Sequence, residues 1–157
     1  MKVVLQRCID ASVVVNNNTV GSIDKGLMLL VGFTKGDSIK EINYMVDKVI
    51  NLRVFDDENG VMNKSLIDVE GSILSISQFT LYGDAKKGRR PSYIKALGGD
   101  EATKLYDLFN ETLRKELNKI NDKLKVEEGI FGADMKVRFT NDGPVTILLE
   151  KEGDISG

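Results

Sequence analysis

The segment Gly26-Leu27-Met28-Leu29-Leu30-Val31-Gly32-Phe33 decides the fold. It is short, consists of apolar residues and glycine, and begins at a glycine. A short continuous apolar run between turn residues is typical of a strand that is buried on both faces. We therefore expect residues 26–33 to form the central strand of a sheet.

The residues that precede this run predict its neighbour in the sheet. Lys2–Asp10 has the composition of a strand, and Ala11–Val15 continues rich in β-branched residues. Asn16–Asn18 suits a hairpin turn, after which Thr19–Ile23 returns the chain toward the central run. We expect an antiparallel pair that leads into the central strand.

Two segments have helical periodicity. The first spans residues 38–52 and begins with a capping box, in which Ser38 precedes Glu41 by three positions. Its apolar stripe is Ile39, Ile42, Met45, Val46, Val49 and Ile50. The second spans residues 100–123, with the stripe Ala102, Leu105, Phe109, Leu113, Leu117 and Ile120. Each stripe predicts a surface helix with one face on a sheet.

Later strands are expected at Ser72–Ser77, at Met135–Phe139 and at Val145–Glu150. The segment Asn141-Asp142-Gly143-Pro144-Val145-Thr146 lies between the last two and has the composition of a tight turn, since Asp and Gly tolerate positive φ. The sequence thus predicts a mixed α/β fold: a sheet or barrel-like layer with two main surface helices. Its 157 residues fit one compact domain, 1–157, with 151–157 as a frayed tail that lacks apolar anchors.

The composition restricts the chemistry. The chain has no histidine, which excludes the usual general base, the Ser or Cys triad that depends on it, and the commonest zinc ligand. Cys8 is the only cysteine and lies in an apolar strand, so we interpret it as a buried thiol. The acidic run Asp56–Gly60 lacks the ligand spacing of a calcium loop. We expect no metal and no cofactor.

Two further features concern location and partners. Residues 1–7 lack the pattern of a secretory signal, and no apolar run approaches the roughly 20 residues that span a bilayer. We expect a cytoplasmic protein with no membrane contact. Lys86, Lys87, Arg89 and Arg90 lie together on a Gly/Pro-marked loop, in a chain of net charge −2. The loop is either a solvated charge run or a local binding site for RNA phosphates.

Two motifs together carry a resemblance. Ser77-Gln78-Phe79-Thr80-Leu81-Tyr82 and Asn141-Asp142-Gly143-Pro144-Val145-Thr146 resemble the hallmark motifs of the D-aminoacyl-tRNA deacylases, the chiral-proofreading hydrolases of translation. The likeness extends to Gln6-Arg7, Met62–Leu66, Lys86–Ser92 and Phe131–Val137. It therefore covers nearly the whole chain in the expected order. Gly83, where the family usually has another small residue, and Leu97-Gly98-Gly99 are the departures.

The resemblance implies a homodimer that acts on aminoacyl-tRNA. In such a dimer the Gly143-Pro144 bond is cis and enters the active site of the other subunit, and Arg7 supports it. The Gly143 carbonyl receives the substrate α-amino group, and the Gly143-Pro144 backbone excludes an L side chain by collision.

The resemblance also implies the reaction, which is hydrolysis of the ester of a D-amino acid, or glycine, with the terminal adenosine of tRNA. Ser77, Gln78, Phe79 and Thr80 are the expected catalytic segment, with backbone N–H groups near Gln78 and Phe79 holding the oxyanion. The 2′-hydroxyl of the tRNA activates the water. The adenine pocket is expected at Phe131, Gly132, Ala133 and Met135.

Two alternatives remain open at this stage. Thr80 is either a positioning residue or a covalent nucleophile of a different esterase, although no histidine exists to activate it. The chain could also be a non-catalytic dimeric RNA-binding module that uses the basic loop.

Overall fold

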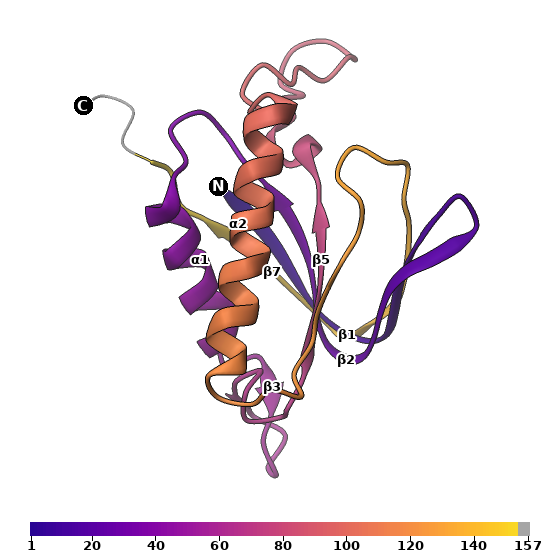
Figure 1. The fold of residues 1–157 in the computed structure, drawn as a ribbon, viewed down its shortest axis with the longest axis vertical. Coiled ribbons are helices and arrows are strands. Elements are labelled where there is room, and N and C mark those ends of the chain that lie inside the picture. The colour runs from indigo at the N-terminus through magenta and orange to yellow at the C-terminus, as the bar shows by residue number, and fades with distance from the viewer. Residues whose placement is uncertain (154–157) are drawn as a thin grey trace.

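The computed structural model describes residues 1–153 (Figure 1). Five strands form the main sheet in the order β6-β5-β2-β1-β7, and two short strands, β3 and β4, form a separate pair. The strands are β1 (Lys2–Val15), β2 (Asn18–Gly32), β3 (Phe55–Asp56), β4 (Met62–Lys64), β5 (Ser72–Ser77), β6 (Val126–Glu128) and β7 (Lys136–Glu150). The helices are α1 (Ile39–Asn51), the short 3-10 helix η1 (Phe79–Tyr82) and α2 (Gly99–Asn118).

The predicted central strand is confirmed as the second half of β2. This strand pairs antiparallel with β1 and parallel with β5, so it is the third of the five strands. Asn16 and Asn17, both at positive φ, form the turn that joins β1 to β2. Gly26 has φ 145°, and a β-carbon there would overlap the Ser72 carbonyl of β5. Glycine is therefore required where the two strands first pair.

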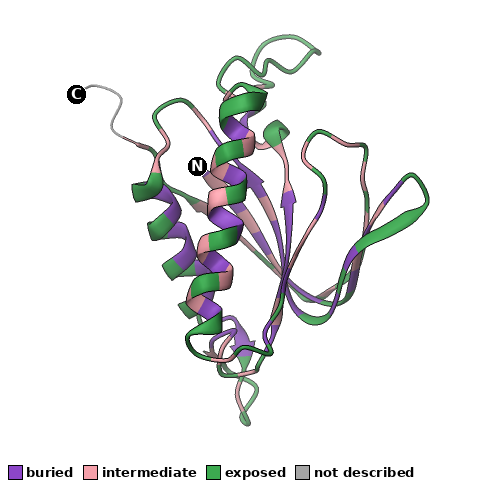
Figure 2. Ribbon diagram, viewed as in Figure 1, coloured by how far each residue is buried: buried purple, intermediate pink, exposed green. Residues whose placement is uncertain are grey.

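Both long helices cover the same face of the sheet (Figure 1). Their inward sides are buried and their outward sides are exposed, as Figure 2 shows. The α1 prediction is confirmed within one residue at each end, because Ser38 caps the helix and its N–H donates to Glu41 Oε1 at 2.8 Å. The main core therefore lies between the helix pair and the sheet, and a smaller apolar cluster around Cys8, Met28 and Leu74 lies outside it.

The predicted end of α2 is wrong. The helix ends at Asn118, so the segment up to residue 123 is not helical, and Ile120 is exposed rather than part of the buried stripe. The Asn121 side chain accepts a hydrogen bond from the Lys123 N–H at 3.0 Å. Such a local side-chain bond competes with helix continuation and favours a turn.

The predicted turn at Asn141–Thr146 is also wrong. β7 runs without a reversal from Lys136 to Glu150, and it pairs with β1 on both sides of the motif. Between the pairs Cys8 with Asn141 and Gln6 with Thr146, β1 contributes only Arg7, whereas β7 contributes residues 142–145. The motif is therefore a bulge in a long strand, because the pairing with β1 overrides the local turn composition.

The sheet is open and not a barrel, because β6 and β7 are its two edges. Only part of the predicted frayed tail, 151–157, falls in the described residues. There Lys151 is held, since its N–H donates to the Met1 carbonyl at 3.0 Å. Residues 154–157 lie outside the part that the structure describes. Across residues 1–153, none of the helices has the length and apolarity needed to span a membrane.

Candidate active site

A cavity of about 290 Å³ opens where β5 ends. It brings together the expected adenine pocket and three of the four residues of the expected catalytic segment. Its lining includes Ser77, Gln78, Phe79, Phe131, Gly132, Ala133 and Met135, together with Ile76, Asp134 and Val137. The expected catalytic segment and the expected adenine pocket are thus two walls of one cavity.

The catalytic wall is the transition from β5 to η1. The Gln78 N–H donates to the Val31 carbonyl at 2.7 Å, so it belongs to the sheet and is not available to a substrate. Among the backbone N–H groups near Gln78 and Phe79 that were expected to hold an oxyanion, the Gln78 N–H is therefore already engaged. Within residues 1–153, the Phe79 and Thr80 N–H groups have no hydrogen-bond partner, as is usual for the first residues of a helix. These two amides are the donors that remain available beside the cavity.

The Thr80 side chain is exposed and is not part of the cavity lining. Its hydroxyl oxygen accepts a hydrogen bond from the Gln78 side-chain amide. An amide cannot remove a proton from a hydroxyl, so this contact does not activate a nucleophile. The geometry favours a positioning role for Thr80.

The opposite wall of the cavity, at Phe131, packs against helix α2. The Phe131 ring packs against Tyr106 of α2, with centroids 6.0 Å apart. Burial raises the pKa of the Tyr106 hydroxyl, which stays protonated and donates to the Ser75 carbonyl at 2.7 Å. Tyr106 therefore connects both walls. This role could not be recognised in the sequence, because Tyr106 occurs within an ordinary helical pattern.

The glycine of the bulge has no room for a side chain. The Gly143-Pro144 bond is cis, and Gly143 has φ 117°. A β-carbon at this position would lie 2.8 Å from the Val145 nitrogen and 2.9 Å from Arg7 Nη2. The expected cis bond is confirmed, and only glycine fits this position.

Arg7 holds the bulge from the inside of the sheet. It is 8% exposed, and its Nε donates to the Asp142 carbonyl at 3.2 Å while Nη1 donates to the Val54 carbonyl at 2.9 Å. Its charge is paired with the Asp142 and Asp56 carboxylates at 3.2 and 3.3 Å. A planar cation with several donors suits this arrangement, which ties the bulge to the segment that leads into β3.

Asn141 closes the base of the bulge, a role that the sequence did not reveal. Its Nδ2 donates to the Arg7 carbonyl at 3.1 Å and to the Val145 carbonyl at 3.0 Å. Its Oδ1 accepts from Gln6 Nε2 at 3.0 Å and from the Thr146 hydroxyl at 3.1 Å. One side chain thus replaces the strand hydrogen bonds that the bulge interrupts.

The two motifs are not brought together within one chain. Gly143, Pro144 and Arg7 do not line the cavity. β2 and β1 lie between β5 and β7, and neighbouring strands are about 4.8 Å apart, so β5 and β7 are separated by roughly 14 Å across the sheet. The two motifs therefore occupy separate places within one chain.

The basic loop is a hairpin outside the cavity. Asp84 and Ser92 close it with two backbone hydrogen bonds of 2.7 and 2.8 Å. The four cations Lys86, Lys87, Arg89 and Arg90 are all exposed at its tip. None of these four side chains lines the cavity. They could therefore contact only a part of a substrate that extends out of the cavity.

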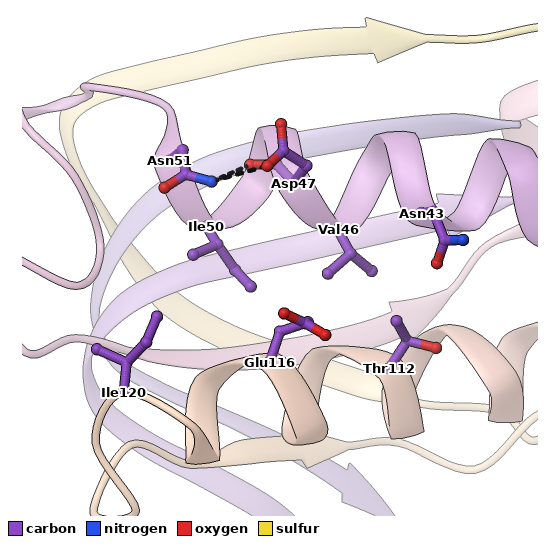
Figure 3. A pocket seen from close by; sticks show the side chains of 8 residues that line it. All are labelled: Asn43, Val46, Asp47, Ile50, Asn51, Thr112, Glu116 and Ile120. Carbon is purple, nitrogen blue, oxygen red and sulfur yellow. Dashed lines mark hydrogen bonds between the residues drawn. The ribbon is translucent and has the colours of Figure 1, made fainter.

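A different cavity, of about 380 Å³, lies between α1 and α2. In Figure 3 the side chains of Asn43, Asp47 and Asn51 line it from α1, opposite Thr112 and Glu116 of α2. Its two charged groups are carboxylates, which would repel an RNA phosphate. None of the residues that the sequence predicted for the site lies here, so we do not assign the reaction to this cavity.

Neither the cysteine nor any acidic cluster offers an alternative centre. Cys8 is buried, and this burial, with a smaller contribution from the Asp142 carboxylate, raises the pKa of its thiol to about 12. A thiol that stays protonated is a poor nucleophile. In the described part of the chain, no three His, Cys, Asp or Glu side chains lie close enough to hold a metal ion.

Comparisons with known proteins identify the family of the chain. Residues 4–150 match the D-Tyr-tRNA(Tyr) deacylase family. A D-aminoacyl-tRNA deacylase of Clostridium botulinum strain 657 is 54% identical over 150 residues, which cover 96% of this chain and 97% of that protein. The enzyme of the same name from strain Alaska E43 is 55% identical, with the same coverage of 96% and 97%.

Two solved structures share the fold. That of a c-Myc DNA unwinding element binding protein is 42% identical, with a TM-score of 0.88 over 98% of this chain and all of that chain. That of a probable eukaryotic D-amino acid tRNA deacylase is 21% identical, with a TM-score of 0.79 over 94% of this chain and 97% of that one. Together with the family match, these relatives show that the chain is an enzyme of the D-Tyr-tRNA(Tyr) deacylase family.

Proposed function

We propose that the chain hydrolyses the ester bond of D-aminoacyl-tRNA and releases the free D-amino acid and tRNA, with glycyl-tRNA as a further candidate substrate. The observation that carries the proposal is the single cavity that joins Phe79, whose backbone amide has no partner within residues 1–153, to the Phe131 wall. Its volume of about 290 Å³ is close to the roughly 300 Å³ at which small-ligand pockets begin. It suits one nucleoside with its ester.

The chemistry requires no side-chain base. The terminal adenine lies against Phe131, Gly132, Ala133 and Met135, which places the ester at the Ser77–Thr80 wall. The 2′-hydroxyl of the terminal ribose activates a water molecule, which attacks the ester carbonyl. The Phe79 and Thr80 N–H groups stabilise the oxyanion, and the bond to the 3′-oxygen then breaks to give the acid and the alcohol.

The selectivity is proposed to come from a second copy of the chain. Its Gly143-Pro144 bulge covers the cavity, the Gly143 carbonyl accepts a hydrogen bond from the substrate α-amino group, and the bulge backbone blocks an L side chain. The separation of the two motifs within one chain supports this arrangement. β7 is also a long exposed edge strand, the kind of surface that pairs with another chain. We therefore propose a homodimer.

A substrate of this kind is used in the cytoplasm, so we also propose a cytoplasmic location for the enzyme.

In this proposal the basic loop contacts tRNA phosphates through Lys86, Lys87, Arg89 and Arg90. Replacement of all four by glutamine is expected to weaken tRNA binding and to reduce its salt dependence, by a slope of roughly 0.7 for each lost contact with single-stranded RNA. The ratio of D to L hydrolysis is expected to stay the same, because phosphate contacts do not read the amino acid.

The decisive experiment compares matched D- and L-aminoacyl-tRNA as substrates for the purified protein. Release of the D-amino acid alone is expected. Equal release from both, or release from neither, would contradict the proposal. A mass measurement in solution tests the homodimer, and a monomer at the concentration of the assay would contradict the shared site.

A second candidate function is nucleic-acid binding without catalysis. A relative that is 42% identical is named for binding a DNA element, and the exposed basic loop offers a surface of suitable charge. This function predicts binding of RNA or DNA with no release of amino acid from either substrate. The same assay therefore separates the two functions.

The role of Thr80 is tested by Thr80→Ala. A Thr80 nucleophile predicts near-total loss of hydrolysis in this variant, whereas a positioning role leaves substantial activity.

A further inference from the structure

Two aromatic rings are exposed at the edge of the cavity. The rings of Phe79 and Tyr93 meet edge to face, with centroids 5.1 Å apart at an angle of 70°. Their exposed fractions are 54% and 41%. Phe79 lines the cavity and Tyr93 does not, so the pair extends from the cavity out onto the surface. Large aromatic groups gathered at the surface beside a pocket often mark a binding site.

The position of Tyr93 is set by its surroundings. Tyr93 directly follows Ser92, which closes the base of the basic loop by pairing with Asp84. A β-carbon at Gly83 would lie only 3.0 Å from Tyr93 Cε1. The absence of a side chain at residue 83 therefore allows the Tyr93 ring to lie beside η1 and reach Phe79. The ring is held in place although much of it is exposed.

Basic residues lie on both sides of Tyr93 in the sequence. The loop whose base ends at Tyr93 bears Lys86, Lys87, Arg89 and Arg90, and Lys95 follows Tyr93 by two positions. The carboxylate of this loop, Asp84, accepts a hydrogen bond from the Lys86 N–H at 2.9 Å. Aromatic faces beside clustered cations are the two components of a surface that binds single-stranded nucleic acid.

We propose that Phe79 and Tyr93 form a stacking platform for the base of the nucleotide that precedes the terminal adenosine of the tRNA 3′ end. This inference rests on the proposed function. A cavity of about 290 Å³ accommodates one nucleoside, so the preceding base has to lie outside it. Unpaired bases in RNA are commonly held by stacking on aromatic side chains. The phosphates on either side of this base are then directed toward the basic loop.

The test compares two substrates of different length, D-aminoacyl-tRNA and the same D-amino acid esterified to adenosine alone. Tyr93→Leu keeps an apolar side chain but removes the ring. It is expected to raise the KM for D-aminoacyl-tRNA about five-fold or more, since stacking of one base accounts for at least that factor. The kcat/KM for the aminoacyl-adenosine is expected to stay unchanged, and Tyr93→Phe is expected to restore normal KM.

Tyr44 provides a matched control, because it is 39% exposed and lies on α1 beside Lys48. Tyr44→Leu is expected to leave both substrates unaffected. Equal losses on both substrates in Tyr93→Leu would show that Tyr93 supports the cavity itself. If Tyr93→Leu lost no activity on either substrate, or if Tyr44→Leu lost as much as Tyr93→Leu, the proposed stacking platform would also be contradicted.

A binding measurement separates this inference from the proposed reaction. If the unaltered protein hydrolyses neither substrate, the proposed function fails, and the platform is then judged by binding of the trinucleotide CCA and of adenosine monophosphate. The platform predicts that CCA binds more tightly and that Tyr93→Leu removes the difference. Equal binding of the two ligands to the unaltered protein would contradict it.

Discussion

Arg7 Nη2 lies 2.9 Å from the place that a β-carbon at Gly143 would occupy. The same guanidinium binds the Asp142 carbonyl through Nε and the Val54 carbonyl through Nη1. Arg7 therefore both supports the bulge and limits the side chain that the bulge can contain. The first two predictions follow from this contact.

Gly143→Ala is expected to lower the free energy of unfolding by about 2 kcal/mol or more, because the new methyl group meets Arg7 and Val145 and the positive φ is unfavourable for alanine. Deacylation is expected to fall with it. Gly60 is a matched control, since it also has positive φ, 75°, but a β-carbon there would meet nothing within 4 Å. Gly60→Ala is expected to cost only roughly 1 kcal/mol and to keep full activity. Urea denaturation and a deacylation assay check both, and similar losses in the two variants would contradict the role of the contact.

Arg7→Met is expected to cost about 3 kcal/mol of stability, since it leaves two carbonyls and two carboxylates without their donor. Arg7→Lys keeps the charge but offers one nitrogen in place of the fork, so an intermediate loss is expected. Denaturation of the three proteins in urea measures the order. If the Arg7→Lys variant were as stable as the unaltered protein, the planar arrangement of the guanidinium nitrogens would not contribute to stability.

Phe79→Pro tests the oxyanion donors. Proline lacks the N–H and fits the first position of a helix. It would follow Gln78, whose φ of −148° and ψ of 88° lie outside the α region that proline disfavours before it. Phe79→Ala is the control, because it also loses the ring but keeps the N–H. The kcat of Phe79→Pro is expected to be about 100-fold below that of Phe79→Ala. Equal kcat values would exclude the Phe79 amide from the reaction.

Because of Cys8, the free energy of unfolding is expected to fall as the pH rises above 9. The pKa of its buried thiol is raised from 9.0 to about 12, so the unfolded chain loses this proton at a lower pH than the folded chain does. The contribution of the thiol to stability is complete below pH 9 and is lost as the pH rises from 9 toward 12. Cys8→Ala removes this titration. Urea denaturation at pH 7 and pH 10 is therefore expected to show a larger loss for the unaltered protein than for Cys8→Ala, and parallel losses would contradict the buried thiol.

The sequence predicted the fold class from local patterns, whereas the residues of the two cavity walls were expected from the resemblance to the deacylase motifs. The apolar run at Leu27–Phe33 and the capping box at Ser38 each indicate one structure irrespective of the rest of the chain. The two motifs were recognisable for the same reason. Family membership, which they implied, is confirmed by the match over residues 4–150.

The errors occur where distant segments decide the structure. Asn141–Thr146 has the composition of a turn, but pairing with β1 on both sides makes it a bulge. The sequence did not distinguish between the backbone amides near Gln78 and Phe79, and the bond from the Gln78 N–H to Val31 on the neighbouring strand does so. Tyr106 and Asn141 act through hydrogen bonds to residues far away in the chain. Local composition contains no signal for such contacts.

The last prediction concerns the assembly of the site from two chains. In a shared site, the β5 wall comes from one subunit and the bulge from the other, so Phe79→Pro and Gly143→Ala damage different halves. A mixed dimer of the two variants contains one site with both halves intact. Equal mixing after unfolding and refolding is expected to restore about a quarter of the unaltered activity, because about half of the dimers are mixed and each has one intact site of two.

The control is the same mixing with each variant alone, which is expected to restore nothing. The double variant with both changes in one chain, mixed with Phe79→Pro, is a second control, since no site in that mixture has both halves intact. If the site lay within one chain, every subunit in the first mixture would contain a damaged site, and activity would stay at the level of the separate variants. Restoration only in the first mixture would therefore require the Gly143 bulge of one chain to act on the cavity of the other.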